Sequence, residues 1–190
     1  MQIIYVLVFL SFIWIIIYQQ RQLREKGKLI KNLGNWYDIA FSDALTGLKN
    51  QAAYSRKISE LERIGMGGWM IIVFDINDFK SINDTCGHLE GDKVLKSFAD
   101  ILKNLFSSPL YNIYRIGGDE FAIIAINANE TKTHELLTEL TRTELNRLSF
   151  TTAKGYAISV EGEPFDAVFK RADDMLYQNK KHKPKRLKKI

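Results

Sequence analysis

The sequence predicts an α+β domain built around a central mixed sheet, carried behind an apolar N-terminal segment. Two observations support this fold class. Apolar runs of strand length alternate with stretches whose apolar residues recur at helical spacing. Two of the strand-like runs also meet at a Gly-Gly-Asp turn, so hairpins are mixed with helical crossovers, as in α+β domains.

The elements follow in the order helix, strand, helix, hairpin, helix, strand, helix. Helical spacing predicts helices over residues 50–64, 91–106, 131–148 and 165–180. The second of these is the most clearly amphipathic, and its inward face comprises Val94, Leu95, Phe98, Ile101, Leu102 and Leu105. Apolar runs bounded by turn or polar residues predict strands over residues 69–74, 111–116, 121–126 and 150–158.

The N-terminal segment is expected to be a membrane anchor. Residues 3–18 carry no charge and a single polar side chain, Ser11, which is close to the shortest length that spans a bilayer. A cleaved signal peptide would begin with basic residues and end at small ones, and neither is present. A helix that is apolar on all sides would be unusual in the core of a small domain. We therefore expect residues 1–18 to form an uncleaved transmembrane anchor.

The flanks of this anchor predict its orientation. Nothing basic precedes it, and five basic residues follow within a short distance: Arg21, Arg24, Lys26, Lys28 and Lys31. The positive-inside rule then places the rest of the chain in the cytoplasm, and a lone cysteine, Cys86, agrees with a reducing compartment. Residues 19–41 form a basic linker with loosely helical apolar spacing, which suits a short dimerising helix, although Gly27 and Gly34 weaken that interpretation.

The net charge of +5 is concentrated at the C-terminus. Residues 180–189 are rich in lysine and arginine and contain no acid, and the rest of the chain is slightly acidic. The simplest interpretation is a solvated basic tail over residues 183–190, and the alternative is a tail that touches an anionic membrane surface. This distribution is weak evidence for nucleic-acid binding, and we expect no nucleic-acid partner.

Residues 115–121 read Arg-Ile-Gly-Gly-Asp-Glu-Phe between two strand-like runs. A plain hairpin explains the glycines, which allow the positive φ angles of a tight turn. A turn does not need two successive acids, however, and here Asp119 and Glu120 follow directly. Gly117 and Gly118 also leave the backbone bare, so that a large anionic ligand can approach closely. The motif suggests a phosphate ligand that arrives with a divalent metal.

A second polar cluster lies where the first predicted strand ends. Asp75 stands at the carboxyl end of that strand, where folds of this kind tend to place ligands. Within the next seventeen residues come Lys80, Asn83, His88 and Asp92. The alternative is a polar loop in which Asn and Asp make turns, and a lone His88 is more often structural than catalytic.

Four separated blocks together resemble the GGDEF family, the diguanylate cyclases. They are residues 43–50, 75–92, 115–121 and 172–180, and the resemblance covers about residues 41–182. It implies a palm-type nucleotidyl cyclase fold with a central sheet of about five strands. It also implies the condensation of two GTP into cyclic di-GMP with release of two pyrophosphates. Each protomer of a homodimer would hold one GTP and two Mg²⁺ ions, or Mn²⁺ in their place.

The resemblance also assigns roles to individual residues. Asp75 and Asp119 would bind the metal ions together with the Ile76 carbonyl, and Glu120 would be a further ligand or assist proton transfer. The catalytic pair would thus be Asp119 and Glu120. The phosphates would be contacted by the backbone or side chains of Gly117, Gly118, Phe79, Lys80 and Lys180. Guanine would be contacted by Asn83 and Asp92, with His88 in support.

Two departures from the family pattern stand out. The closing block usually continues through Gly-Arg-Asn, whereas Lys183-Pro184-Lys185 stands here, leaving Lys183, Lys185 or Arg186 as substitutes for the arginine. Many members also carry an Arg-x-x-Asp inhibitory product site before the signature. Ser108 and Tyr111 occupy those positions, so this site is expected to be absent.

Three functions follow as alternatives. The first is an active cyclase at a bacterial inner membrane, single-pass, with the catalytic domain at residues 42–182 in the cytoplasm. The second is a degenerate module that binds GTP or a protein partner without turnover. The third is a cyclase for an adenine-containing dinucleotide, which Asp92 argues against. Activity would be set by dimerisation through the anchor and linker or by an unidentified regulatory membrane protein.

Overall fold

The computed structural model describes residues 2–65, 67–127 and 129–181, and within these it describes the backbone alone for residues 2–12, 32, 33, 35 and 147. The chain divides into two units, and the boundary falls between Ala40 and Phe41. This boundary lies close to the predicted start of the folded domain at residue 42.

The first unit is formed by helix α1 (Gln2–Phe41) up to Ala40, and this helix continues through the predicted anchor and linker. Gly27 and Gly34 lie within it, and neither has a neighbour close enough to contact an added Cβ. Glycine costs a helix about 1 kcal/mol relative to alanine, which is too little to end a helix of this length. Among the described residues, no helix is both long and apolar enough to cross a membrane. The side chains of residues 1–12, most of the anchor predicted at 1–18, lie outside the described part of the chain.

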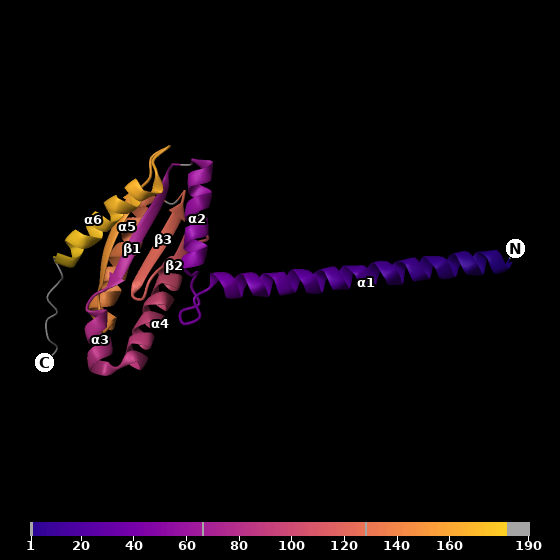
Figure 1. Cartoon of the computed structure of the whole chain (residues 1–190), viewed down its shortest axis with the longest axis horizontal. Helices are drawn as coiled ribbons and strands as arrows, with labels where there is room; N and C mark the ends of the chain where they lie inside the picture. The colour runs from indigo at the N-terminus through magenta and orange to yellow at the C-terminus, as the bar shows by residue number, and fades with distance from the viewer. Residues whose placement is uncertain (1, 66, 128, 182–190) are drawn as a thin grey trace. The chain divides into compact units, whose positions relative to one another are not determined.

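The second unit is built on one antiparallel sheet (Figure 1). In the described residues it has four strands in the order β2-β3-β1-β4, namely β1 (Trp69–Ile76), β2 (Tyr111–Arg115), β3 (Glu120–Ile126) and β4 (Thr152–Ile158). The α+β class is therefore confirmed. A mixed sheet of about five strands was predicted, whereas the four strands in the described residues pair antiparallel throughout. Each crossover joins two strands that run in the same direction, β1 to β2 and β3 to β4, but a strand of the opposite direction lies between them in the sheet. An isolated bridge between Lys49 and Tyr114 is parallel.

The described part of the second unit also has five helices, namely α2 (Gln51–Ile64), α3 (Phe79–Cys86), α4 (His88–Leu105), α5 (Glu130–Arg147) and α6 (Phe165–Lys181). Four of them, α2, α4, α5 and α6, match the predicted helices. Helix α2 has a capping residue at each end. The Asn50 side chain accepts a hydrogen bond from the Ala53 N–H at the start of α2, and Gly65 ends this helix in the left-handed region. Helix α3 is an addition, because its polar sequence reads equally well as a loop.

The helices cover the two faces of the sheet in pairs (Figure 1). Helices α4 and α5 pack on the face that carries Ile72 and Phe74, where Phe98 makes edge-to-face contacts with Phe74 and Phe121. Helices α2 and α6 pack on the face that carries Ile71 and Val73. Strand β1 is central and covered on both faces, and its sequence is therefore a continuous apolar run in which apolar and polar residues do not alternate.

A buried polar cluster joins α5 to β4. Thr152 Oγ1 donates a short hydrogen bond to one carboxylate oxygen of Glu144, and Lys154 Nζ lies 3.2 Å from the other. Lys154 Nζ also donates to Thr141 Oγ1 at 3.0 Å. Burial lowers the pKa of Lys154, and the charge of Glu144 acts in the opposite direction. Glu144 is 3% exposed, so its carboxylate depends on these partners in place of water.

Replacing Glu144 should therefore destabilise the domain strongly. We expect Glu144→Ala to lower the free energy of unfolding by about 3 kcal/mol, because it leaves the Lys154 ammonium buried without its counter-charge. The matched control is Glu139→Ala, which removes an exposed ion pair with Arg142 from the same helix and should change stability by less than about 0.5 kcal/mol. Urea unfolding measures both, and equal losses would contradict the prediction.

Candidate functional site

The two acidic segments singled out in the sequence meet at one end of the sheet. The register of β1 against β3 places Asp75 directly opposite Glu120. Beyond this pair, the Ile76 N–H donates to the Asp119 carbonyl at 3.2 Å. The hairpin turn between β2 and β3 is thereby tied to the carboxyl end of β1, as expected for a site shared by the two motifs.

The turn itself differs from the predicted tight hairpin. Residues 116–119 connect the strands, and both the Ile116 N–H and the Gly117 N–H donate to the Glu120 carbonyl, at 2.9 and 3.3 Å. Neither Gly117 nor Gly118 has a positive φ, so the four-residue turn does not use the conformational freedom of glycine. Gly117 leaves room for the Glu120 side chain instead, because a Cβ there would lie 2.3 Å from Glu120 Oε2 and 3.1 Å from Glu120 Cβ. Gly118 is exposed and open around its Cα, which leaves its backbone accessible.

Asp119 lies in a charged environment that disfavours its ionised form. Burial, followed by the negative charge of Asp75, raises the pKa of Asp119, and the cations Lys180 and Arg115 partly offset this. Lys180 reaches the site from the last turn of α6, with its Nζ 2.7 Å from Asp75 Oδ2. Asp75 is only 17% exposed, so this ion pair is partly shielded from water. Three segments far apart in the sequence thus converge on one strand end.

The chemistry of this strand end fits a divalent cation. Burial and, after it, the negative charge of Asp75 disfavour the ionised form of Asp119, and a cation close to this carboxylate would favour that form. Carboxylate and carbonyl oxygens are the ligands that Mg²⁺ prefers, and it commonly takes only one or two carboxylates from the protein. Among the described residues, no group of three or more His, Cys, Asp and Glu side chains lies close enough together to hold a metal ion.

Helix α3 begins two residues after β1 and carries the first predicted phosphate contacts. Phe79 and Lys80 form its first turn, with Phe79 half-buried against the core and Lys80 exposed. Asp78 precedes them in the left-handed region with φ of 59°, and its side chain does not cap the helix. The backbone N–H groups of the first turn are therefore available to an anion.

The predicted guanine contacts lie on α3 and α4, which pack against each other. A Cβ on Gly91 would lie 1.9 Å from Asn83 Oδ1, so the glycine makes room for the Asn83 side chain against α4. Asp92 follows Gly91 and is half-buried. Helix α4 begins at His88 and not at residue 91 as predicted. His88 is exposed, and it lies in this helix about one turn before Asp92. The structure thus brings Asn83 and Asp92 to neighbouring helices.

Comparison with known proteins decides the family. The model of the "Diguanylate cyclase, GGDEF domain" family matches residues 40–186. This chain belongs to the GGDEF family. GGDEF domains bind GTP and cyclic di-GMP, and the diguanylate cyclases among them synthesise cyclic di-GMP and generally use divalent metals.

Individual relatives agree with this assignment. The probable diguanylate cyclase DgcI of Escherichia coli is 33% identical over 153 residues, which cover 80% of this chain and 34% of that protein. Diguanylate cyclase VdcA of Vibrio cholerae is 30% identical over 168 residues, which cover 82% of this chain and 49% of that protein. The chain thus spans between a third and a half of the length of these two relatives.

Solved structures show the same fold. The coiled coil and GGDEF domain of DgcB from Caulobacter crescentus, in complex with c-di-GMP, is 29% identical with a TM-score of 0.69, covering 85% of this chain and 92% of that one. Diguanylate cyclase SiaD from Pseudomonas aeruginosa, solved with its activator SiaC, has a TM-score of 0.72 over 86% of this chain and 67% of that one. At 22% identity, SiaD supports the fold alone.

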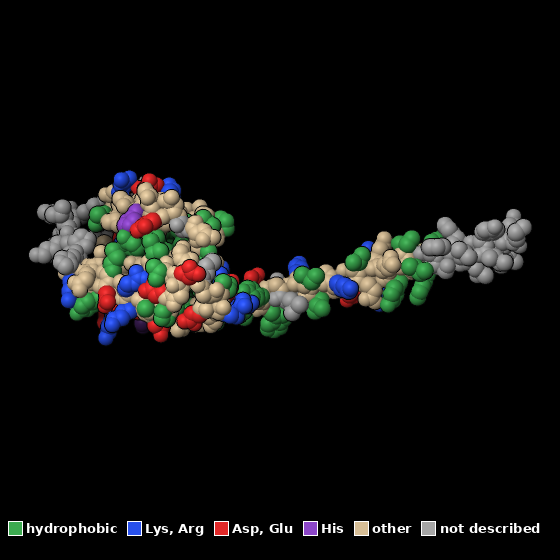
Figure 2. All heavy atoms as spheres, turned by 90° about the horizontal axis from the view of Figure 1, so that it is seen from above, with side chains coloured by type: hydrophobic (Ala, Val, Ile, Leu, Met, Phe, Trp, Pro, Cys, Tyr) green, Lys and Arg blue, Asp and Glu red, His purple; other side chains and the backbone are tan. Residues whose placement is uncertain are grey.

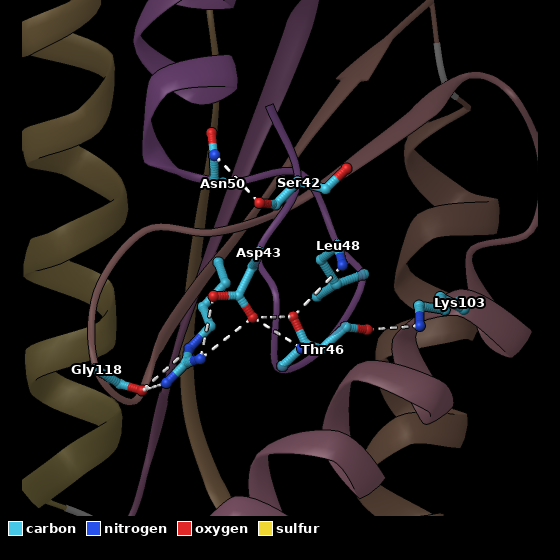
Figure 3. Close-up of polar contacts among 8 residues, drawn as sticks. Ser42, Asp43, Thr46, Leu48, Asn50, Lys103 and Gly118 are labelled. Carbon is cyan, nitrogen blue, oxygen red and sulfur yellow. Dashed lines mark hydrogen bonds and ion pairs between the residues drawn. The ribbon is translucent and has the colours of Figure 1, made fainter. Parts of the chain in front are cut away.

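The GGDEF turn is held by a clamp that sequence reasoning missed (Figure 3). Arg115 donates from Nη2 and Nε to the Gly118 carbonyl, at 2.7 and 3.2 Å, and from Nη1 to both carboxylate oxygens of Asp43, each at 3.2 Å. Asp43 also accepts from the Thr46 N–H at 2.8 Å and the Thr46 hydroxyl at 2.6 Å. An Asp three residues before a Thr signals such a local turn, but nothing in the sequence pairs it with Arg115.

The clamp makes Asp43 sensitive to pH. Burial acts to raise the pKa of Asp43, but hydrogen bonds from Thr46 and Arg115 outweigh it and hold the pKa below its ordinary value of 3.8. A carboxylate whose pKa is lower in the folded state stabilises the fold above the unfolded value. This contribution is lost as the pH falls from about 3.8 through the folded pKa.

We expect Asp43→Asn to lower the free energy of unfolding by about 2 kcal/mol at neutral pH, because it removes a charge-assisted bond to Arg115. Amide hydrogen exchange should also accelerate in the turn at residues 116–119. The deficit relative to wild type should shrink as the pH falls below 3.8. Asp174→Asn, at an exposed position on α6, serves as the control, and a deficit that stays constant with pH would refute the assignment.

Proposed function

We propose that this chain is an active diguanylate cyclase that condenses two GTP into cyclic di-GMP and releases two pyrophosphates. The observation that carries the proposal is the meeting of the two acidic motifs at one strand end, where Asp75 lies opposite Glu120 and the Ile76 N–H binds the Asp119 carbonyl. The negative charge of Asp75 also acts on the carboxyl group of Asp119. Such a pair is costly in a purely structural turn. It is useful where a divalent cation and a triphosphate must be held together.

In this proposal Asp75 and Asp119 hold Mg²⁺, or Mn²⁺, with the Ile76 carbonyl and Glu120 as further ligands. When bound, the ions supply positive charge that favours ionisation of the attacking 3′-hydroxyl and stabilises the leaving pyrophosphate. Glu120 lies against Gly117, at the point where the turn meets the strand, and can also take up a proton. The chain's own part is to fix these oxygens before substrate arrives.

Other residues position the nucleotide. The open backbone at Gly118, beside Gly117, admits the α-phosphate, and Lys80, the backbone N–H of Phe79 and Lys180 face the β- and γ-phosphates. Asn83 and Asp92 recognise guanine, since a carboxylate accepts from N1–H and the 2-amino group, which adenine does not offer. His88 supports this pocket. Lys183, Lys185 and Arg186, the substitutes for the usual phosphate-binding arginine, lie outside the described residues.

The reaction requires two copies of the chain, because each domain holds one GTP. Helix α1 offers a way to bring them together, because hydrophobic side chains are exposed along it (Figure 2). Leu23, Ile30 and Tyr37 recur along it at seven-residue intervals and are 69%, 70% and 50% exposed, the spacing of a two-helix seam. DgcB, which this chain resembles, likewise includes a coiled coil with its GGDEF domain. We therefore infer a homodimer joined through α1.

We also propose that residues 1–18 anchor the dimer in a bacterial cytoplasmic membrane, single-pass, with the catalytic domain on the cytoplasmic side. The support is the uncharged run at residues 3–18 and the basic residues that follow it. An unidentified membrane protein that contacts the anchor or the linker would then be a natural regulator.

The enzymatic proposal is tested by the product formed from GTP and Mg²⁺ by the full chain. We expect cyclic di-GMP from the wild type and at least about a hundredfold less from Asp119→Ala, because the loss of one metal ligand raises the barrier by several kcal/mol. Glu139→Ala, at an exposed position on α5, should retain full activity. A dimeric wild type that binds GTP and yields no product would instead support the non-catalytic module.

The absence of the Arg-x-x-Asp pair predicts weak product inhibition. Ser108 and Tyr111, at the two positions, contact each other through the Tyr111 N–H and the Ser108 carbonyl at 3.0 Å. The Tyr111 hydroxyl is 3.0 Å from Thr133 Oγ1, so these positions present no guanidinium or carboxylate to guanine. We expect no non-competitive inhibition when cyclic di-GMP is titrated to micromolar levels, and inhibition in that range would show that the prediction is wrong.

A further inference from the structure

Helix α6 packs on one face of the sheet and also sends side chains to the outer edge of β4. Within the described part of the chain, strand β4 is the last strand in the sheet order, so one of its edges has no neighbouring strand there. Alternate residues of an edge strand turn their backbone groups outward, and such groups need other partners. In β4 these residues are Lys154, Tyr156 and Ile158, and side chains of α6 contact the backbone of all three.

The contacts form a matched series. Arg171 donates to the Ile158 carbonyl at 2.7 Å, the Tyr156 N–H points to Met175 Sδ at 3.5 Å, and the Lys154 N–H donates to Asn179 Oδ1 at 3.3 Å. The helix residues are four apart and the strand residues are two apart. Four helical residues advance about 6 Å and two strand residues about 6.6 Å, so the two repeats match over the length of the contact. The series therefore defines the register of α6 along β4.

Close backbone packing supports the same register. A Cβ on Gly155 would lie 2.0 Å from the Ala172 carbonyl oxygen and 2.4 Å from the Leu176 nitrogen. The helix backbone therefore rests directly on the strand at this glycine, and Ala172 and Leu176 are buried there. Arg171 is also bound to Glu163 at 2.7 and 2.9 Å, which secures the first half of the helix. Asn179 is the corresponding contact in the last turn.

We propose that Asn179 is a positioning residue for the active site. It is the neighbour of Lys180, whose Nζ lies 2.7 Å from Asp75 Oδ2. The Lys154 N–H that Asn179 accepts from belongs to the residue opposite Phe74, one position before Asp75. Holding Asn179 on the strand edge therefore places the backbone of Lys180 where its ammonium reaches the strand end. Without this hydrogen bond the last helical turn frays, as unrestrained helix ends do.

The inference rests on the proposed function for its effect on turnover, but its structural part does not. The experiment compares Asn179→Ala, Lys180→Ala, the double variant and wild type, all as the full chain. Asp174→Ala is the control, at an exposed position on the same helix. Three quantities are measured: hydrogen exchange of the Lys154 amide, affinity for GTP with Mg²⁺, and kcat for cyclic di-GMP.

In Asn179→Ala we expect the Lys154 amide to exchange at least about tenfold faster, because its hydrogen-bond acceptor is removed. GTP affinity should fall about fivefold, the factor associated with one hydrogen bond. In the Lys180→Ala background the same change should alter affinity less than about twofold, since Asn179 acts through Lys180. The control should match wild type in all three quantities.

Two results would overturn the proposal. One is unchanged exchange of the Lys154 amide in Asn179→Ala. The other is a fivefold loss of GTP affinity that persists in the Lys180→Ala background, which would give Asn179 a role independent of Lys180. If wild type binds GTP without making cyclic di-GMP, the proposed function fails, and exchange and affinity still decide the role of Asn179.

Discussion

The antiparallel register between β1 and β3 is the constraint on which the rest of the site depends. It places Asp75 opposite Glu120 and, one step further, lets the Ile76 N–H bind the Asp119 carbonyl. A slip by one residue would turn every β3 side chain to the opposite face and would take Phe121 out of the cluster around Phe98. The apolar core on both faces therefore holds the acidic residues of the two motifs together at one strand end.

The positive charges around this strand end come from the middle and from the end of the domain sequence. Arg115, itself held by Asp43, binds the turn through the Gly118 carbonyl, and Lys180 binds Asp75 from the last turn of α6. Both cations lower the pKa of Asp119 against the effects of burial and Asp75. The site is thus assembled from segments far apart in sequence, and preorganisation of this kind is what phosphoryl transfer requires of a protein.

Much of this domain was predictable because its signals are local. The alternation of strand and helix periods predicted four strands and four of the five helices that accompany the sheet, and the motif blocks predicted the residues around the strand end. Helix α3 was not predicted, because Lys80, Asn83 and Asp84 suit a polar loop as well as a short exposed helix. Gly117 was predicted to allow a positive φ angle, whereas it leaves room for the Glu120 side chain. The position of that side chain depends on the folded turn, and no local sequence pattern predicts it.

The sequence by itself determined the family, the acidic pair and the glycines of the turn, because these depend on residue types at short spacings. The tertiary structure decided which distant groups neutralise that pair. Arg115 meets Asp43 across 72 positions and Lys180 meets Asp75 across 105, and such pairings follow only from how the strands register and how α6 lies along β4. The helix register is set by backbone groups at a sheet edge and by the space above Gly155. The sheet edge and the space above Gly155 form only when the strands pair, so no local sequence motif predicts them.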